Sequence, residues 1–343
     1  AVMAAVVTLW ITEALPMPVT ALLGAAACVA LRVAPAKEVF APFADPLMFL
    51  FIGAFMVARA IFVHDLHRRL AYAVLSIGWV GARPSRILFV FGAVTAFLSA
   101  WISNTATTAM MFAIGLSLLA FLFEHGGSTP QAMRFATGMM LMTSFAASIG
   151  GLATPIGTPP NVIGLGFIRQ MLGVEFPFFK WTMIGVPVVV TLFLFLYFYL
   201  NALTGKAMPA ISGGREMLRR EVESLGPWTR AQKSTLAAFL ITVALWVVPG
   251  IVALVAGAES ETYKAINARV PEAVAALVGA ALLFLLPGDG GKRAITWEDA
   301  VKIDWGVVML YGGGFALGVL SFETGLAEAL GRGITSVLPI QNS

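Results

Sequence analysis

The chain has 343 residues, of which 59% are hydrophobic and only 12% are charged, and its mean hydropathy is +0.88. Soluble globular domains carry about 25% charged residues, so this composition excludes an ordinary soluble domain and predicts an all-α polytopic membrane protein. The net charge of +4 does not indicate a nucleic-acid partner, because the basic residues lie in short segments between apolar runs. A single cysteine, Cys28, excludes a disulfide within the chain.

The first 45 residues contain two apolar runs, residues 2–12 and 19–31. Pro16 and Pro18 lie between them and remove two backbone donors, which argues against one continuous helix. We therefore predict that residues 1–45 form N-terminal scaffold helices. Because the chain opens inside an apolar run without an initiator methionine, we expect it to be truncated at this end, and at the other end for a reason given below.

Residues 46–180 are predicted to form the core of a first repeat, beginning with a membrane span. Between residues 87 and 123 lie two apolar arms with no charged or turn-forming loop between them. Their only interruption is the uncharged cluster Ser103-Asn104-Thr105. Irregular backbone at membrane depth is tolerated where it is buried in protein or lines a cavity, so we predict a re-entrant hairpin over residues 87–123 with this cluster at its tip. The alternative, hydroxyl groups that serve only helix packing, does not account for the amide of Asn104.

A second polar stretch interrupts the apolar sequence between residues 135 and 172. Three prolines and two threonines fall within residues 154–161, so a regular helix cannot continue through them. A break frees carbonyl groups of the first half-helix, which suit a hard cation such as sodium, and amide groups of the second half, which suit an anion. Transporters use discontinuous helices in this way. We predict a broken helix over residues 135–172, with a simple proline kink as the alternative.

The rest of the chain is divided by one long polar segment. We predict a scaffold helix at residues 181–200 and a cytoplasmic loop at residues 201–235. Residues 236–302 are predicted to form the scaffold helices of a second repeat, and residues 303–343 the incomplete start of its core. When the 201–235 loop is placed inside, most lysines and arginines between the spans fall on the cytoplasmic side, as the positive-inside rule requires. The hairpin then enters the membrane from the cytoplasm.

A weak internal repeat appears at an offset of 260 residues. In both copies an apolar span follows an acidic residue, and a short surface element follows the span. The charge distribution gives the copies opposite orientations, which is typical of transporters with a binding site at mid-membrane. The counterpart of Ser103 would lie near position 363, so half of the site is expected outside these 343 residues. The identical pairs are Leu50 and Leu310, Gly53 and Gly313, Phe55 and Phe315, Leu66 and Leu326, and Leu70 and Leu330.

Four motifs carry a resemblance to one family. Ser103-Asn104-Thr105 is similar to the first of its two Ser-Asn-Thr signatures, and residues 150–161 (Gly-Gly-Leu-Ala-Thr-Pro-Ile-Gly-Thr-Pro-Pro-Asn) are similar to its broken-helix motif. Residues 10–16 and 311–318 also resemble it. On these motifs the sequence resembles the divalent anion/sodium symporter (DASS) family, whose members carry dicarboxylates, citrate or sulfate. The resemblance covers essentially the whole chain.

The resemblance implies a secondary active transporter, not an enzyme, that works by alternating access in the inner (plasma) membrane. It implies symport of a small divalent anion with sodium as coupling ion, no organic cofactor, and a homodimer in the lipid bilayer. The residues it assigns to sodium are Ser99, Ser103, Asn104 and Gly157. The residues it assigns to the anionic substrate are Asn104, Thr105 and Thr158.

Other functions remain open at this point. One is a sodium-independent dicarboxylate exchanger of the same family. Another is a cation/proton antiporter of the wider superfamily, which would be expected to place an intramembrane carboxylate at the break, where residues 154–161 have none. An intramembrane enzyme would need a His/Asp/Glu cluster or a nucleophile and base within the spans, and we find neither in the sequence. A channel is disfavoured by the paired, asymmetric motifs.

Overall fold

The computed structural model describes residues 1–80, 83–205, 214–257 and 259–337. Within these residues the chain is helical, with one isolated bridge between Pro287 and Arg293 and no β-strand. Parts of the predicted 201–235 loop and of the predicted 303–343 core lie outside the described residues.

The helices have the following bounds. The first nine are α1 Val2–Thr12, α2 Met17–Ala30, α3 Ala36–Phe40, α4 Pro46–Val63, α5 Leu66–Leu75, α6 Pro84–Ser99, α7 Asn104–Gly126, α8 Pro130–Gly150 and α9 Pro159–Leu172. The others are α10 Phe178–Leu200, α11 Gly214–Ser224, α12 Arg230–Ala256, α13 Glu261–Arg269, α14 Glu272–Leu285, α15 Trp297–Ala300, α16 Trp305–Glu323 and α17 Leu326–Val337. Short turns of 3-10 helix occur at Ala41–Ala44 and Pro155–Gly157, and a π-helical turn occurs at Asn201–Gly205.

Several helical stretches of the described residues are long and apolar enough to cross a membrane. Helices α13 and α14 are also long and apolar enough when taken together, as a single span with a bend of 52° between them. The prediction of an all-α polytopic membrane protein is therefore confirmed. Apart from this bent pair, the five stretches that pass the same test singly are Ala36–Val63, Asn104–Glu124, Phe178–Thr204, Arg230–Ala256 and Trp305–Glu323.

Helices α4 and α16 have matching surroundings in the chain. Each follows an aspartate, Asp45 or Asp304, whose side chain accepts a backbone N–H of the first helical turn. Two residues after each helix ends, the backbone is left-handed, at Asp65 with φ of 51° or at Gly325 with φ of 73°. A short helix, α5 or α17, begins at the next residue in both cases. The repeat predicted from the sequence thus extends to the helices and their caps, while the inversion of the second copy stays a prediction.

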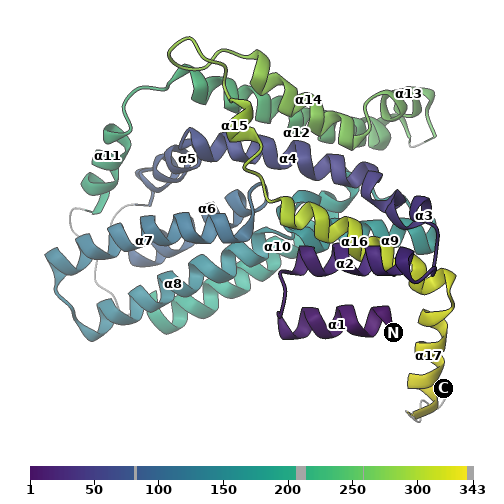
Figure 1. Cartoon of the computed structure of the whole chain (residues 1–343). Coiled ribbons are helices and arrows are strands. Elements are labelled where there is room, and N and C mark those ends of the chain that lie inside the picture. The colour runs from purple at the N-terminus through teal and green to yellow at the C-terminus, as the bar shows by residue number, and fades with distance from the viewer. Residues whose placement is uncertain (81–82, 206–213, 258, 338–343) are drawn as a thin grey trace.

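The helices pack in three groups, which Figure 1 shows: α4 with α12 and α14 at the top, α1 with α2 and α16 below, and α6, α7, α8 and α10 extending to the left. Glycines bring backbones close together inside the first two groups. A Cβ on Gly53 of α4 would lie 2.5 Å from the backbone carbon of Ala276 in α14, and one on Gly313 of α16 would lie 2.9 Å from the backbone of Ala21 in α2. Such contacts leave little freedom for sliding.

The contact between α9 and α16 is made differently. Gly166 of α9 lies beneath the rings of Tyr311 and Phe315, and Gly318 of α16 lies beneath the ring of Phe167. Here the outer ends of side chains, rather than backbone atoms, fill the space between the helices. A displacement of α9 along α16 therefore disturbs no close backbone contact at these positions.

Candidate functional site at the hairpin tip and the helix break

The polar cluster predicted at a hairpin tip lies in a turn between two helices. Helix α6 ends at Ser99, and α7 begins at Asn104 and runs back beside α6 (Figure 1). Ser103 is the N-cap of α7, and its Oγ accepts the backbone N–H of Ala106 at 3.3 Å. The cluster thus interrupts the helix because Ser103 satisfies one of the backbone N–H groups that an N-terminus leaves open. The re-entrant path of the arms through a membrane stays a prediction.

Asn104 is held from both sides. The fully buried Ser99 donates a hydrogen bond from Oγ to Asn104 Oδ1 at 2.7 Å. On the other side, Asn104 lies against Gly151, where an added Cβ would be 2.4 Å from Oδ1. Gly151 directly follows α8, so the hairpin tip and the helix break meet at this asparagine. The approach depends on glycine, because any side chain at position 151 would displace the amide.

The predicted break in the second helix is present. Helix α8 ends at Gly150, and α9 starts at Pro159 after a turn of 3-10 helix. Asn161 donates from Nδ2 to the carbonyl oxygens of Gly151 at 2.8 Å and Thr154 at 2.9 Å. It therefore satisfies the Gly151 carbonyl oxygen, which the break leaves without a helical partner, and is a second donor to the Thr154 carbonyl oxygen beside the N–H of Gly157. Thr154 in turn donates from Oγ1 to the carbonyl oxygen of Ala100, which ties the break to the hairpin.

Helix α10 supports the break from the opposite side. Trp181 donates from Nε1 to the carbonyl oxygen of Leu152 at 3.0 Å, and a Cβ on Gly185 would lie 2.7 Å from the same oxygen. Phe178, at the start of α10, stacks on Trp101 next to the hairpin tip, with ring centroids 6.3 Å apart. The backbone around the candidate site is therefore fixed by three elements, α6, α8 and α10.

The structure brings together part of the residue set assigned to sodium. Ser99 and Asn104 are hydrogen-bonded, and Gly157 is buried with its α-carbon close to the Gly151 carbonyl, since a Cβ on Gly157 would be 2.5 Å from that oxygen. Asn104 and Gly157 thus both adjoin Gly151. Ser103 is exposed at the tip, and its hydroxyl serves as a helix cap.

The residues assigned to the substrate lie at the starts of two helices. Thr105 is exposed in the first turn of α7, and the half-buried Thr158 is the N-cap residue of α9 without a side-chain capping bond. Helix α9 begins with two prolines, and the N–H of Asn161 already bonds to the Thr158 carbonyl oxygen at 3.1 Å. The amide donors expected from the second half-helix are therefore not available, because proline has none.

Helix α7 offers the donors that α9 lacks. Among the described residues, the backbone N–H groups of Asn104 and Thr105 have no hydrogen-bond acceptor, as is usual for a first helical turn. They lie at the positive end of a 23-residue helix. Free backbone N–H groups that could donate to an anion are therefore found at the hairpin tip rather than at the start of α9.

Four residues that contribute to this site were missed in the sequence analysis: Gly151, Thr154, Asn161 and Thr107. The first three belong to the stretch that predicted the break, but only the fold shows what these residues contact. Thr107 is 1% exposed, and its Oγ1 has no hydrogen-bond partner within the described residues. The buried helical threonines Thr95, Thr143 and Thr242 donate to the carbonyl four residues earlier, while Thr235 of α12 has, like Thr107, no partner among the described residues. A buried hydroxyl without a hydrogen-bond partner, one turn from Asn104, is suited to coordinate a cation through its oxygen.

The site has no ionisable side chain among the residues named here. The described residues also contain no group of three or more His, Cys, Asp or Glu side chains that could hold a metal ion. Hydroxyl, amide and carbonyl oxygens are the ligands of hard cations. The arrangement therefore offers oxygen ligands of the kind that a hard cation takes, and hydrogen-bond donors for an anion, without a fixed charge.

Comparison with known proteins gives one family and a set of close relatives. The family model described as the sodium:sulfate symporter transmembrane region matches residues 1–341. The chain is 34% identical over 334 residues to a protein of Staphylococcus saprophyticus named sodium-dependent dicarboxylate transporter SdcS, covering 95% of this chain and 62% of that protein. It is 31% identical over 339 residues to the protein of the same name from Staphylococcus aureus, covering 97% of this chain and 63% of that one. The chain thus spans less than two thirds of the length of these relatives.

Proposed function

Since the chain belongs to the sodium:sulfate symporter family, we propose that it is part of a secondary active transporter that couples the movement of a small divalent anion to sodium. A dicarboxylate such as succinate or malate is the proposed substrate, because the two relatives compared above are named for dicarboxylates. Citrate and sulfate are the other candidates. The proposal includes alternating access, a homodimer and a place in the plasma membrane.

One observation carries the proposal: Asn104 lies between Ser99 and Gly151, where the hairpin tip meets the helix break. We propose that sodium binds here through Ser99, Ser103, Asn104 and Gly157, with the hydroxyl of Thr107 as a further ligand. Two segments far apart in the chain supply these groups, so bound sodium would hold the tip and the break together. Because the same tip residues bind the substrate, ordering the tip in this way would make substrate binding depend on sodium binding.

The substrate is proposed to bind beside the sodium ion at the hairpin tip. One carboxylate would accept hydrogen bonds from the side chains of Asn104, Thr105 and Thr158 and from the free N–H groups at the start of α7. Uncharged donors bind a dianion more weakly than arginine would, because charge-assisted bonds are the stronger kind. Weak binding suits a carrier, which must release what it binds.

Two alternatives are separated from the proposal by specific observations. A sodium-independent exchanger would not need the oxygen-rich meeting of Ser99, Asn104 and Gly157. A cation/proton antiporter would need a titratable group, and the residues of the candidate site carry none. We therefore favour sodium symport.

The proposal is tested by uptake into proteoliposomes that contain the protein over its full natural length. Labelled succinate is expected to accumulate only when sodium is higher outside, and Asn104→Ala is expected to lower uptake at least tenfold, since it removes a ligand and a donor together. Asn267→Ala, in α13 away from the site, is the matched control and should keep wild-type uptake. Uptake without sodium that requires internal succinate would favour the exchanger, and no uptake of succinate, citrate or sulfate would contradict the substrate class.

Thr107 gives a separate prediction for the sodium site. Thr107→Val keeps the shape of the side chain and removes the unpaired hydroxyl, so it should leave folding unchanged or slightly improved. We expect the sodium concentration for half-maximal uptake to rise severalfold, and Thr107→Ser to restore it. Thr143→Val, which removes a buried hydroxyl that is already bonded in α8, is the control. An unchanged sodium dependence in Thr107→Val would exclude this residue as a ligand.

A further inference from the structure

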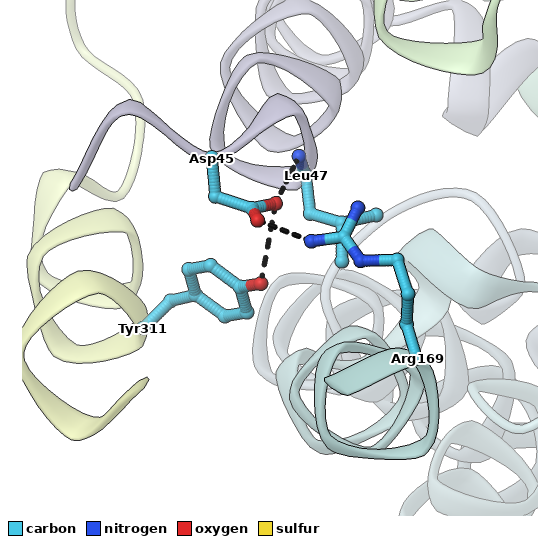
Figure 2. A network of polar contacts seen from close by, with 4 residues as sticks. All are labelled: Asp45, Leu47, Arg169 and Tyr311. Carbon is cyan, nitrogen blue, oxygen red and sulfur yellow. Dashed lines mark hydrogen bonds and ion pairs between the residues drawn. The ribbon is translucent and has the colours of Figure 1, made fainter. Parts of the chain in front are cut away.

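A charged contact joins three helical elements at the far end of α9. Arg169, in the last turn of α9, forms an ion pair with Asp45, which precedes α4. Tyr311 of α16 donates from its hydroxyl to Asp45 Oδ1 at 3.5 Å, and the backbone N–H of Leu47 donates to the same oxygen at 2.8 Å. Figure 2 shows the side chains of Arg169 and Tyr311 reaching the Asp45 carboxylate from two other ribbons, while Leu47 lies on the same ribbon as Asp45.

The elements that meet there differ in how firmly they are anchored. Helices α4 and α16 are held by close backbone contacts, through Gly53 to α14 and through Gly313 to α2. Helix α9 contacts α16 through the ends of aromatic rings, and it continues from the break that holds the candidate site. The Asp45–Arg169 pair therefore crosses a boundary between well-anchored helices and the element that carries half of the site.

The two partners of this pair are not equivalent. Asp45 is 11% exposed and keeps two other hydrogen-bond donors, Leu47 and Tyr311, if Arg169 leaves. Arg169 is 36% exposed, so its guanidinium is already partly hydrated and regains the rest of its hydration when it leaves Asp45. A cavity of about 240 Å³, lined partly by Arg169, Glu175 and Glu272, lies beside the pair and gives the side chain room to move. Opening the pair would thus leave the Asp45 carboxylate with two neutral hydrogen-bond donors in place of its counter-charge.

We infer that Asp45, Arg169 and Tyr311 form a latch that favours the arrangement seen here and opens when α9 moves relative to α4 and α16. This inference rests on the proposed alternating access, because it assigns the latch to one of the two states. Asp45 and Tyr311 are the fixed side of the latch, and Arg169 is the moving side. The latch sets the balance between states and takes no part in binding the cargo.

The test measures a distance rather than transport. Spin labels are placed at the exposed positions Glu38→Cys in α3 and Gln170→Cys in α9, with Cys28→Ser removing the cysteine of this segment. In Arg169→Gln, the fraction of molecules whose label-to-label distance is longer or more broadly distributed is expected to rise about three- to tenfold. This is the size of effect expected for a partly buried ion pair. Arg169→Lys, which keeps the charge, should restore most of the original distribution.

A second variant guards against a folding defect at Arg169. Asp45→Asn removes the charge while asparagine still caps α4, and it is expected to shift the distribution in the same direction as Arg169→Gln. Asp304→Asn is the matched control, because Asp304 caps α16 without an ion pair among the described residues. Distributions identical to wild type in both Arg169→Gln and Asp45→Asn would overturn the latch. Failure of succinate uptake in the wild type would contradict the proposed function separately, since the distances are measured without substrate.

Discussion

Gly151→Ala is expected to abolish sodium-dependent uptake in a protein that still folds. The new Cβ would lie 2.4 Å from Asn104 Oδ1 and 3.0 Å from Nδ2, so the amide must turn away. Turning it breaks the 2.7 Å bond from Ser99 and removes Asn104 from the meeting of the tip and the break. The clash is with the end of a side chain and not with backbone, so the helices can keep their places. Uptake of labelled succinate is the measurement, and at least a tenfold loss is expected.

The control for Gly151→Ala is Gly164→Ala in α9. A Cβ at Gly164 meets nothing within 4 Å, so the same chemical change there should preserve both uptake and thermal stability. Wild-type uptake in Gly151→Ala would contradict the role given to Asn104. A protein that no longer folds would show that the backbone around Gly151 cannot relax, and Asn104→Ala would then carry the test.

The adjacent substitution, Gly150→Ala, is expected to damage the fold itself. Its Cβ would lie 2.1 Å from the carbonyl oxygen of Ala96 and 2.5 Å from its α-carbon. Both are backbone atoms of α6, so α6 and α8 must separate along the hairpin. Overpacking of this kind costs about 1–3 kcal/mol. The expected result is a lower temperature of thermal unfolding in detergent, together with reduced yield of monodisperse protein.

The comparison of neighbouring glycines makes the Gly150 prediction specific. Gly151→Ala and Gly164→Ala should unfold close to the wild-type temperature, while Gly150→Ala should not. Equal unfolding temperatures for all three variants would mean that α6 and α8 are less closely packed than the structure has them. Activity alone would not separate these cases, because Gly150→Ala and Gly151→Ala should both lose uptake.

Much of the fold follows from local sequence patterns. The prolines of residues 154–161 cannot continue a helix, and Ser103 supplies a cap where an apolar run would otherwise continue. The repeat was visible because equal spacing of similar residues needs no knowledge of contacts. Helix α13 was not predicted, because it is short and polar, and its bend into α14 depends on tertiary packing.

The candidate site was predictable in location but not in detail. The family resemblance assigned residues of both the hairpin tip and the break to one sodium site, yet the contact of Asn104 with Gly151 joins residues that no periodicity relates. The role of Asn161 was missed because an asparagine after two prolines reads as a helix start, whereas its side chain turns back to the break. The pairing of Arg169 could not be predicted, since a charge near the end of an apolar run gives no sign of its partner more than a hundred residues earlier.

The absence of ionisable side chains among the residues named at the tip and the break has an electrical consequence. Each elementary charge that crosses a membrane potential of 100 mV changes in energy by roughly 2.3 kcal/mol. These residues contribute no such charge, so the voltage would act on the cargo rather than on them. A dianion with two sodium ions would cross without current, and a third sodium ion would make each cycle carry one positive charge inward. Current recorded per molecule of substrate would then count the coupled ions directly.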